Sequence, residues 1–230
     1  MRSYSELREI ALRRKGGEAA LAALMPDPPL SANELSGLAD DRWLSAMAKC
    51  IFQAGFSWSV IEAKWPGFEE AFEGFDPARV ARYGEVDLDR LLADARIVRN
   101  GAKVNAVLRN ARMLVDLAAA HGTAARFFAQ WPADDQVGLM QVMAKTGGHL
   151  GGNTGQRVLR MMGRDTFVLS GDVVLRLIAE GVVAQVPKSQ KDMAAVQAAF
   201  NDWAAQSGES LNNISRTLAL SIGASPEDIF

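Results

Sequence analysis

Residues 145–155 read KTGGHLGGNTG, a glycine-rich break between two segments that have helical periodicity. Five glycines in eleven residues are too many for a continuous helix, so we expect a turn here and a second helix from about Gln156. Such a turn exposes unpaired backbone N–H groups at the positive end of the second helix, where an anion such as a DNA phosphate binds well. Alternatively, the segment is a flexible interhelical loop. No Gly-Lys-Ser/Thr closes it, which excludes a nucleotide P-loop.

Helical signals dominate the rest of the chain, and we find no convincing strand pairs and no internal repeat, so the predicted fold class is all-α. Helices are predicted over about 5–15, behind Asp40 or Asp41 to about 54, from Ser57 to Pro66-Gly67, from Asp76-Pro77, from Asp87, after Asn100, over 134–145, after 156, near Asp172, over 190–206 and over 210–222. A brief extended piece is predicted at 166–169, and Ser225-Pro226 opens a final turn.

The composition is that of an ordinary globular protein, with 49% hydrophobic and 23% charged residues in a chain of 230. No apolar run approaches the roughly 20 residues that span a bilayer, and the first residues carry charge where a secretory leader is apolar. We therefore expect a cytoplasmic protein, monomeric and without membrane contact. Cys50 is the only cysteine and there are two histidines, so we expect no structural metal and no cofactor.

The net charge of −2 is unevenly distributed. Two windows contain no acid, and each is rich in basic residues. The first, between Asp94 and Asp116, holds Arg96, Arg99, Lys103, Arg109 and Arg112, and the second, between Asp135 and Asp165, holds Lys145, Arg157, Arg160 and Arg164. Such windows are typical of a surface that contacts phosphates, and equally of solvated basic helix faces.

Asp172 follows the extended segment and stands at the start of an apolar helix. From spacing alone its carboxylate is an N-cap. Its place shortly after the glycine-rich turn favours a second interpretation, because cleavage of an N-glycosidic bond passes through a positively charged sugar. A fixed carboxylate stabilises that charge.

A group of aromatic residues lies at the predicted end of the second helix. Phe52 and Phe56 are one helical turn apart, and Ser57-Trp58 follow directly. Aromatic side chains beside a helix break can form a stacking slot for an extruded base. The alternative is core packing, which is the commoner role of a single tryptophan on a helix.

Several of these segments together resemble the DNA-3-methyladenine glycosylase I family. The resemblance covers about 45–115 and rests on Phe52-Gln53-Ala54-Gly55-Phe56-Ser57-Trp58, Phe68, Phe72, Phe75-Asp76-Pro77, Val80, Asp94-Ala95-Arg96-Ile97-Val98-Arg99-Asn100, Lys103 and Asn110-Ala111-Arg112. The glycine-rich segment and Gly171-Asp172-Val173-Val174-Leu175-Arg176 are similar to the wider helix-hairpin-helix DNA glycosylase superfamily, which extends the resemblance to about 185.

The resemblance implies a single two-lobed helical domain over 1–230, with one lobe of about 40–125 and a second of 1–39 plus 126–230. It implies a base-excision-repair enzyme that binds double-stranded DNA containing a damaged base and removes alkylated purines such as 3-methyladenine. Asp172 would be the catalytic carboxylate. The base pocket would include Trp58, Phe56, Cys50, Phe52 and Ser57, and the DNA contacts would include Gly151, Gly152, Asn153, Thr154, Gly155, Arg157, Asn100 and Lys103.

The chain departs from the pattern of its relatives at several places. Gln156 and Arg157 stand where bifunctional superfamily members carry a catalytic lysine, so the resemblance implies a monofunctional hydrolase. The zinc-binding Cys and His residues of the family are absent, and Cys50 occupies the position of the family's pocket glutamate. The alternative function is a catalytically inactive or altered-specificity binder of damaged DNA.

Overall fold

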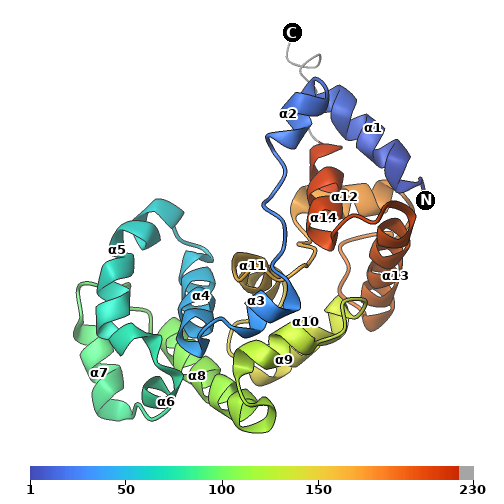
Figure 1. Cartoon of the computed structure of the whole chain (residues 1–230). Helices are drawn as coiled ribbons and strands as arrows, with labels where there is room; N and C mark the ends of the chain where they lie inside the picture. Colours follow the sequence, from blue (N-terminus) through green and yellow to red (C-terminus); the bar gives the residue numbers. More distant parts are fainter. Residues whose placement is uncertain (223–230) are drawn as a thin grey trace. The chain divides into compact units, whose positions relative to one another are not determined.

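The computed structural model describes residues 1–222, and all regular secondary structure in that range is helical (Figure 1). The predicted all-α class is confirmed. The chain forms two compact units. The terminal unit comprises Met1–Pro29, Pro132–Val137 and the chain from Asp165 onward, and the central unit comprises Leu30–Trp131 and Gly138–Arg164. Residues 30–39, 126–131 and 138–164 thus belong to the central unit, whereas the predicted division places them in the second lobe with the two ends of the chain. The division into two lobes stays a prediction.

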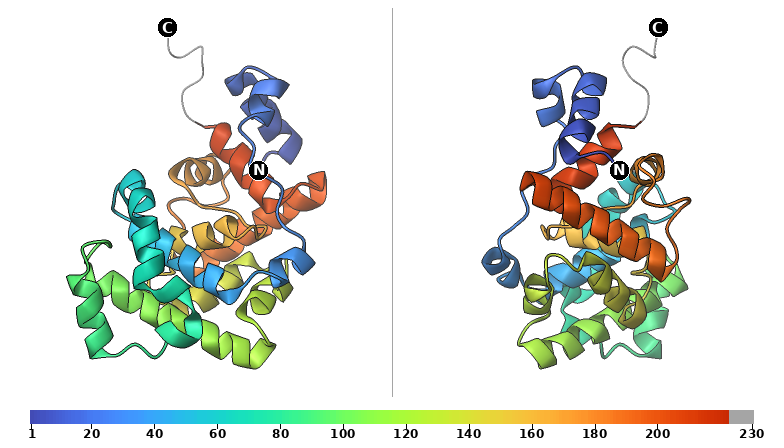
Figure 2. Two further views of the ribbon diagram at one scale, coloured as in Figure 1. Left: turned by 60° about the vertical axis from the view of Figure 1, so that its left-hand side comes forward. Right: turned by 90° about the vertical axis from the view of Figure 1, so that its right-hand side faces the viewer.

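The terminal unit consists of helices from both ends of the sequence. They are α1 (Tyr4–Lys15), α2 (Glu18–Ala22), α12 (Gly171–Ala179), α13 (Gln190–Ser207) and α14 (Leu211–Leu220). Helix α14 packs against α1, α12 and α13, which Figure 2 shows for α1 and α13. Phe167 stacks on Phe200 with ring centroids 4.3 Å apart, and Phe200 meets Trp203 edge-on. This buried aromatic group ties the extended segment before α12 to α13.

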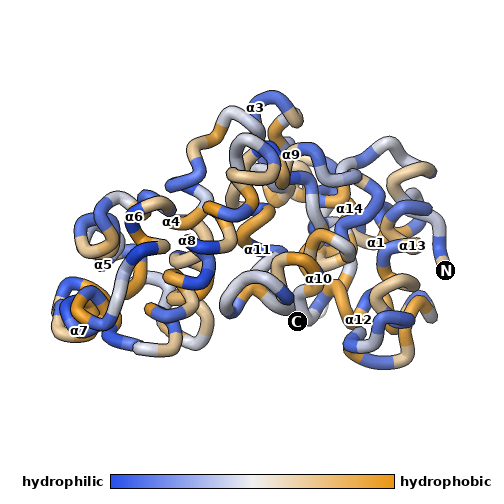
Figure 3. The backbone as a smooth tube through the Cα atoms, turned by 90° about the horizontal axis from the view of Figure 1, so that it is seen from below, coloured by the Kyte–Doolittle hydropathy of each residue, from blue (hydrophilic) through white to orange (hydrophobic). Residues whose placement is uncertain are grey.

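The central unit is built around the longest helix. Its helices are α3 (Ala32–Ser36), α4 (Asp40–Gln53), α5 (Trp58–Ala71), α6 (Pro77–Val80), α7 (Glu85–Ala93), α8 (Gly101–His121), α9 (Ala124–Gln130), most of α10 (Gln136–Thr146) and α11 (Asn153–Met161), with a 3-10 turn at Glu73–Phe75. Helix α8 buries Val104, Val107 and Leu108 and contacts α4, α6 and α9. Apolar and polar stretches alternate along the helices of Figure 3, as expected when each helix buries one face.

Several helix starts follow the capping signals in the sequence. Asp76 accepts hydrogen bonds from the N–H groups of Ala78 and Arg79, and Asn100 accepts one from that of Lys103. These contacts confirm the predicted starts at Asp76-Pro77 and after Asn100. The helix predicted at Asp87 begins two residues earlier, at Glu85, although the Asp87 carboxylate still accepts from the Gly84 N–H at 3.1 Å.

Two predictions about α4 and α5 are wrong. Asp40 does not cap its own helix; its carboxylate accepts hydrogen bonds from the N–H groups of Ala124 and Ala125 and so caps α9. Helix α5 does not end at Pro66-Gly67 but continues to Ala71. Burial of the next helical turn, with Phe68 and Ala71 fully inaccessible, outweighs the hydrogen bond lost at the proline.

Three helices of the structure were missed in the sequence: α2, α3 and α9. The sequence contains a signal that indicates α3, a capping box in which the side chains of Ser31 and Glu34 each accept a hydrogen bond from the other residue's backbone N–H group.

The predicted turn at Ser225-Pro226 lies outside the described residues. No described helix combines the length and apolarity needed to cross a membrane.

Candidate nucleic-acid interface and base slot

The glycine-rich turn is fastened to α8 by a buried side chain. Asn110 is inaccessible to solvent, and its Oδ1 accepts a hydrogen bond from the Gly148 N–H at 2.6 Å while its Nδ2 donates to the Gly148 carbonyl at 3.1 Å. A Cβ at Gly148 would lie 2.8 Å from Cα of Ala106, so only glycine lets the turn approach α8 this closely. The family resemblance includes Asn110 but implies no role for it; the signal that could have indicated one is a polar residue on an otherwise apolar helix face.

Arg109 holds the end of α10 from the same helix. Its Nε donates to the Thr146 carbonyl at 3.0 Å and its Nη2 to the Lys145 carbonyl at 2.8 Å. These are the last carbonyls of α10, which have no partner within the helix. Together with the Asn110 contacts, they fix α10 and the turn on one rigid support.

Helix α10, the glycine-rich turn and α11 together form a helical hairpin. Its second helix, α11, begins at Asn153, three residues before the predicted start. Its N-cap is Gly152, whose φ of 57° lies in the left-handed region and whose lack of a side chain leaves the first N–H groups uncapped. Gly151, Gly152 and Asn153 are exposed, Thr154 is half-buried, and Gly155 is buried against the Leu150 carbonyl. The accessible start of α11, from Gly152 to Thr154, thus presents backbone N–H groups without a side-chain cap, which is the arrangement that binds a phosphate.

Asp172 lies in the first turn of α12 in the terminal unit. The N-cap of α12 is Ser170, whose side chain accepts from the Val173 N–H, so the alternative reading of Asp172 as the cap is wrong. Within the part of the chain that the structure describes, the exposed Asp172 carboxylate makes no hydrogen bond or ion pair. The carboxylate is therefore free to interact with a ligand.

The aromatic residues predicted for the base pocket separate into two groups. Phe56 and Trp58 are 43% and 49% exposed, and their rings are open to a ligand. Phe52 is fully buried, with its ring centroid 4.6 Å from that of Phe68, so core packing is the correct reading for this residue. Ser57 is exposed at the N-cap of α5, and its hydroxyl pairs with that of Ser59 instead of capping the helix.

Arg157 contacts one of these two exposed aromatic residues, Trp58. Its guanidinium carbon lies 3.8 Å from the centroid of the Trp58 ring, which is a close cation–π contact. Cys50 of α4 is 5% exposed, and burial raises the pKa of its thiol to about 11 although the positive charge of Arg157 opposes that shift. The thiol therefore stays protonated and neutral at physiological pH. We call Trp58, Arg157 and Cys50 the candidate base slot.

Two residues predicted to contact DNA have partners inside the protein. Asn100 caps α8, and the Lys103 ammonium donates to the carbonyls of Phe52 at 3.2 Å and Ala54 at 2.6 Å. Lys103 thereby closes the end of α4 and lies 4.6 Å from the centroid of the Phe56 ring. Each residue thus has a structural role, Asn100 at the start of α8 and Lys103 at the end of α4, and their contact with DNA stays a prediction.

The two basic windows are largely engaged within the protein. Arg96 pairs with Asp94 and Glu70, while Arg109, Arg112 and Arg164 donate to backbone carbonyls. Arg99 and Lys145 are exposed, and their side chains have no hydrogen bond or ion pair within residues 1–222. Only part of the predicted positive surface is therefore free for phosphates.

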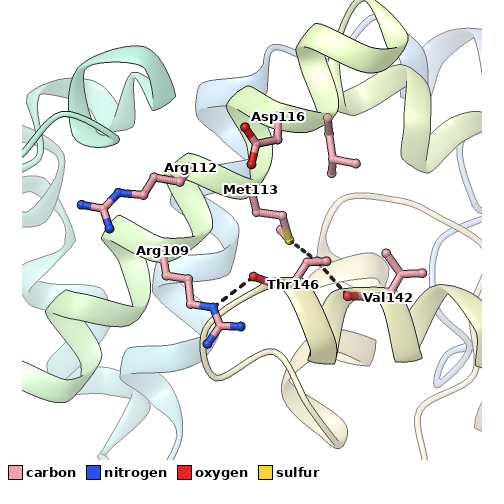
Figure 4. A pocket seen from close by; sticks show the side chains of 7 residues that line it. Arg109, Arg112, Met113, Asp116, Val142 and Thr146 are labelled. Atoms are coloured by element: carbon pink, nitrogen blue, oxygen red, sulfur yellow. Dashed lines mark hydrogen bonds between the residues drawn. The ribbon is translucent and has the colours of Figure 1, made fainter.

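A pocket of about 260 Å³ lies between α8 and α10, where Arg109, Met113 and Thr146 face one another (Figure 4). The Thr146 hydroxyl donates to the Val142 carbonyl at 2.8 Å, and Asp116 also lines the pocket. None of the residues predicted for base binding or catalysis lines this pocket. Among the described residues, no three His, Cys, Asp or Glu side chains gather in an arrangement that could hold a metal ion.

Solved DNA glycosylases have a similar helical fold. The 8-oxoguanine DNA glycosylase of Methanocaldococcus jannaschii matches with a TM-score of 0.53 at 12% identity, over 92% of this chain and 89% of that one. A variant of 3-methyladenine DNA glycosylase I in complex with 3-methyladenine matches with a TM-score of 0.51 at 20% identity, over 69% of this chain and 95% of that one. At these identities the similarity establishes the fold.

The family follows from the sequence itself. The pattern of the methyladenine glycosylase family matches residues 38–174, and the chain belongs to that family. DNA-3-methyladenine glycosylase 1 of Escherichia coli (strain K12) is 38% identical over 65 residues, which are 28% of this chain and 35% of that protein. DNA-3-methyladenine glycosylase of Haemophilus influenzae is 35% identical over 60 residues, 26% of this chain and 32% of that protein. The matched segments span about a third of the length of these two relatives.

Proposed function

We propose that this protein is a monofunctional DNA N-glycosylase that removes alkylated purines such as 3-methyladenine from double-stranded DNA. The observation that carries the proposal is the free carboxylate of Asp172, which is exposed, is not needed as a helix cap and has no partner among residues 1–222. Family membership supports the same chemistry. The proposed substrate class is taken from the names of the two relatives, which are DNA-3-methyladenine glycosylases.

The backbone amides, the aromatic rings and the carboxylate each have one role in the proposed reaction. The amides of Gly151 to Thr154 would hold a phosphate of the damaged strand, and the exposed rings of Phe56 and Trp58 would border the extruded base. The bond between C1′ and the purine nitrogen breaks with its electron pair leaving on the purine. Asp172 stabilises the resulting positive charge on the sugar. The oxygen of a water molecule bonds to C1′, and one proton passes to solvent.

The residues after the hairpin glycines support hydrolysis without strand cleavage. A lyase step needs an amine that forms a Schiff base with C1′. Gln156 is buried and Arg157 carries a guanidinium, so neither supplies that amine. The product would be an abasic site in an intact strand.

The test is base release from duplex DNA treated with a methylating agent. We expect chromatography of the supernatant to show free 3-methyladenine, and we expect strand breaks only after alkali treatment. DNA binding should weaken steeply between about 50 and 200 mM salt, because bound phosphates release counterions. Salt-sensitive binding without release of any methylated base would contradict the enzymatic proposal and favour a non-catalytic binder of damaged DNA.

A further inference from the structure

The pocket between α8 and α10 lies wholly within the central unit. Its volume of about 260 Å³ is near the lower end of the range for small-molecule sites, so it suits a compound with one ring. Met113, Leu117 and Val142 form its apolar surface, and Met113 is only 5% exposed. We call this cavity the α8–α10 pocket.

The carboxylate of Asp116 is available to a ligand of this pocket. Among residues 1–222 the exposed Asp116 side chain makes no hydrogen bond or ion pair. Arg112 lies four residues earlier, at the spacing of an ion pair along a helix. Its Nε instead donates to the Ala81 carbonyl at 3.2 Å, and its guanidinium points away from Asp116 (Figure 4). The negative charge of Asp116 is thus left without a partner although a cation is within helical reach.

The second arginine of the pocket is engaged with the backbone. Arg109 donates to the last carbonyls of α10, where the negative end of the helix dipole offsets its charge. The Thr146 hydroxyl donates to the Val142 carbonyl and lies 3.1 Å from Sδ of Met113, and its oxygen can still accept a hydrogen bond. The pocket therefore offers two acceptor groups, the Asp116 carboxylate and the Thr146 hydroxyl, beside an apolar surface.

We infer that the α8–α10 pocket is a second ligand site, which takes a small organic cation with a flat apolar body, such as an aryl amidine. The ring fills the apolar part, where the sulfur of Met113 makes a favourable contact with an aromatic face or edge. The planar amidinium donates two N–H groups to the Asp116 carboxylate, the geometry of a bidentate ion pair. The inference does not depend on the proposed glycosylase function, because none of the residues predicted for base binding or catalysis lines this pocket.

The experiment uses the whole chain with carbon-13-labelled methionine methyl groups. The probes are benzamidine, benzamide and benzoate, which have similar shapes and are cationic, neutral and anionic. Met113→Leu identifies the Met113 methyl resonance. We expect benzamidine to shift that resonance in a saturable titration. Benzamide and benzoate should bind about tenfold or more weakly, because a hydrogen bond to a charged group contributes at least that factor.

Two variants and a matched control assign the binding to this pocket. Asp116→Asn keeps the shape and removes the charge, so it should weaken benzamidine binding by about tenfold. Val142→Trp fills the pocket and should abolish the shift. Asp89 is also an exposed aspartate of the central unit without a hydrogen bond or ion pair among the described residues. Asp89→Asn should therefore leave binding unchanged.

Three results would overturn the inference. They are a Met113 resonance that benzamidine does not shift, tighter binding of benzoate than of benzamidine, and equal benzamidine affinity of Asp116→Asn and wild-type protein. Because Asp116 is exposed, we expect Asp116→Asn to unfold at the wild-type temperature, which separates loss of the contact from loss of the fold.

Discussion

Asp172→Asn is expected to reduce base release from methylated DNA by at least about a hundredfold, the effect typical of removing a group aimed at developing charge in a transition state. The amide keeps the size of the carboxylate and loses its negative charge, so it cannot stabilise a positively charged sugar. DNA affinity should be retained, because removal of an exposed negative charge does not weaken phosphate contacts. Single-turnover release rates and a binding titration measure the two effects separately.

The structure provides a matched control for this variant. Asp27 is likewise an exposed aspartate of the terminal unit without a hydrogen bond or ion pair among the described residues. Asp27→Asn changes the net charge equally and should leave base release unchanged. Because Ser170 caps α12, Asp172→Asn should also leave the thermal stability nearly unchanged. Equal release by the Asp172 variant and wild-type protein would remove Asp172 from the mechanism.

Asn110→Ala is expected to destabilise the protein by roughly 2–4 kcal/mol, since each buried backbone group that loses its partner costs about 1–3 kcal/mol. The substitution leaves the N–H and the carbonyl of Gly148 without the side chain that satisfies them. The turn can then separate from α8, so DNA affinity should fall as well. Urea unfolding measures the first effect and a DNA titration the second.

Asn105 supplies the comparison on the same helix. It is exposed, and its side chain donates only to the Gly101 carbonyl one turn earlier. Asn105→Ala should therefore change the unfolding free energy by less than about 0.5 kcal/mol, as is usual for surface positions. If both asparagine variants unfold at the same urea concentration, Asn110 is not the anchor of the hairpin.

The sequence predicts those elements whose causes are local. The all-helical class follows from periodicity, and the starts at Asp76 and Asn100 follow from side chains that bond the next turn of their own helix. The hairpin is likewise visible as a run of glycines that no helix tolerates. The start of its second helix was predicted three residues too late because Gly152 forms the cap without a side chain, so no residue type marks the start.

Contacts between distant residues could not be predicted in the same way. Asp40 lies at the start of α4 and caps α9, more than 80 residues later, which its local pattern does not indicate. The same holds for the guanidinium of Arg157 on Trp58, since nothing in either segment specifies the other. The resemblance supplied the candidate residues, and the structure decided between packing and exposure for Phe52 and Trp58.

The most direct test of the central claim is the affinity for two abasic-site analogues in otherwise identical duplexes. A pyrrolidine analogue carries a positive charge where the sugar cation would form, and a tetrahydrofuran analogue is its neutral counterpart. Tighter binding of a transition-state mimic is the mark of a catalytic site. We predict that wild-type protein binds the pyrrolidine duplex about tenfold or more tighter than the tetrahydrofuran duplex, and that Asp172→Asn binds the two equally. Equal affinity of the wild-type protein for both duplexes would contradict the account.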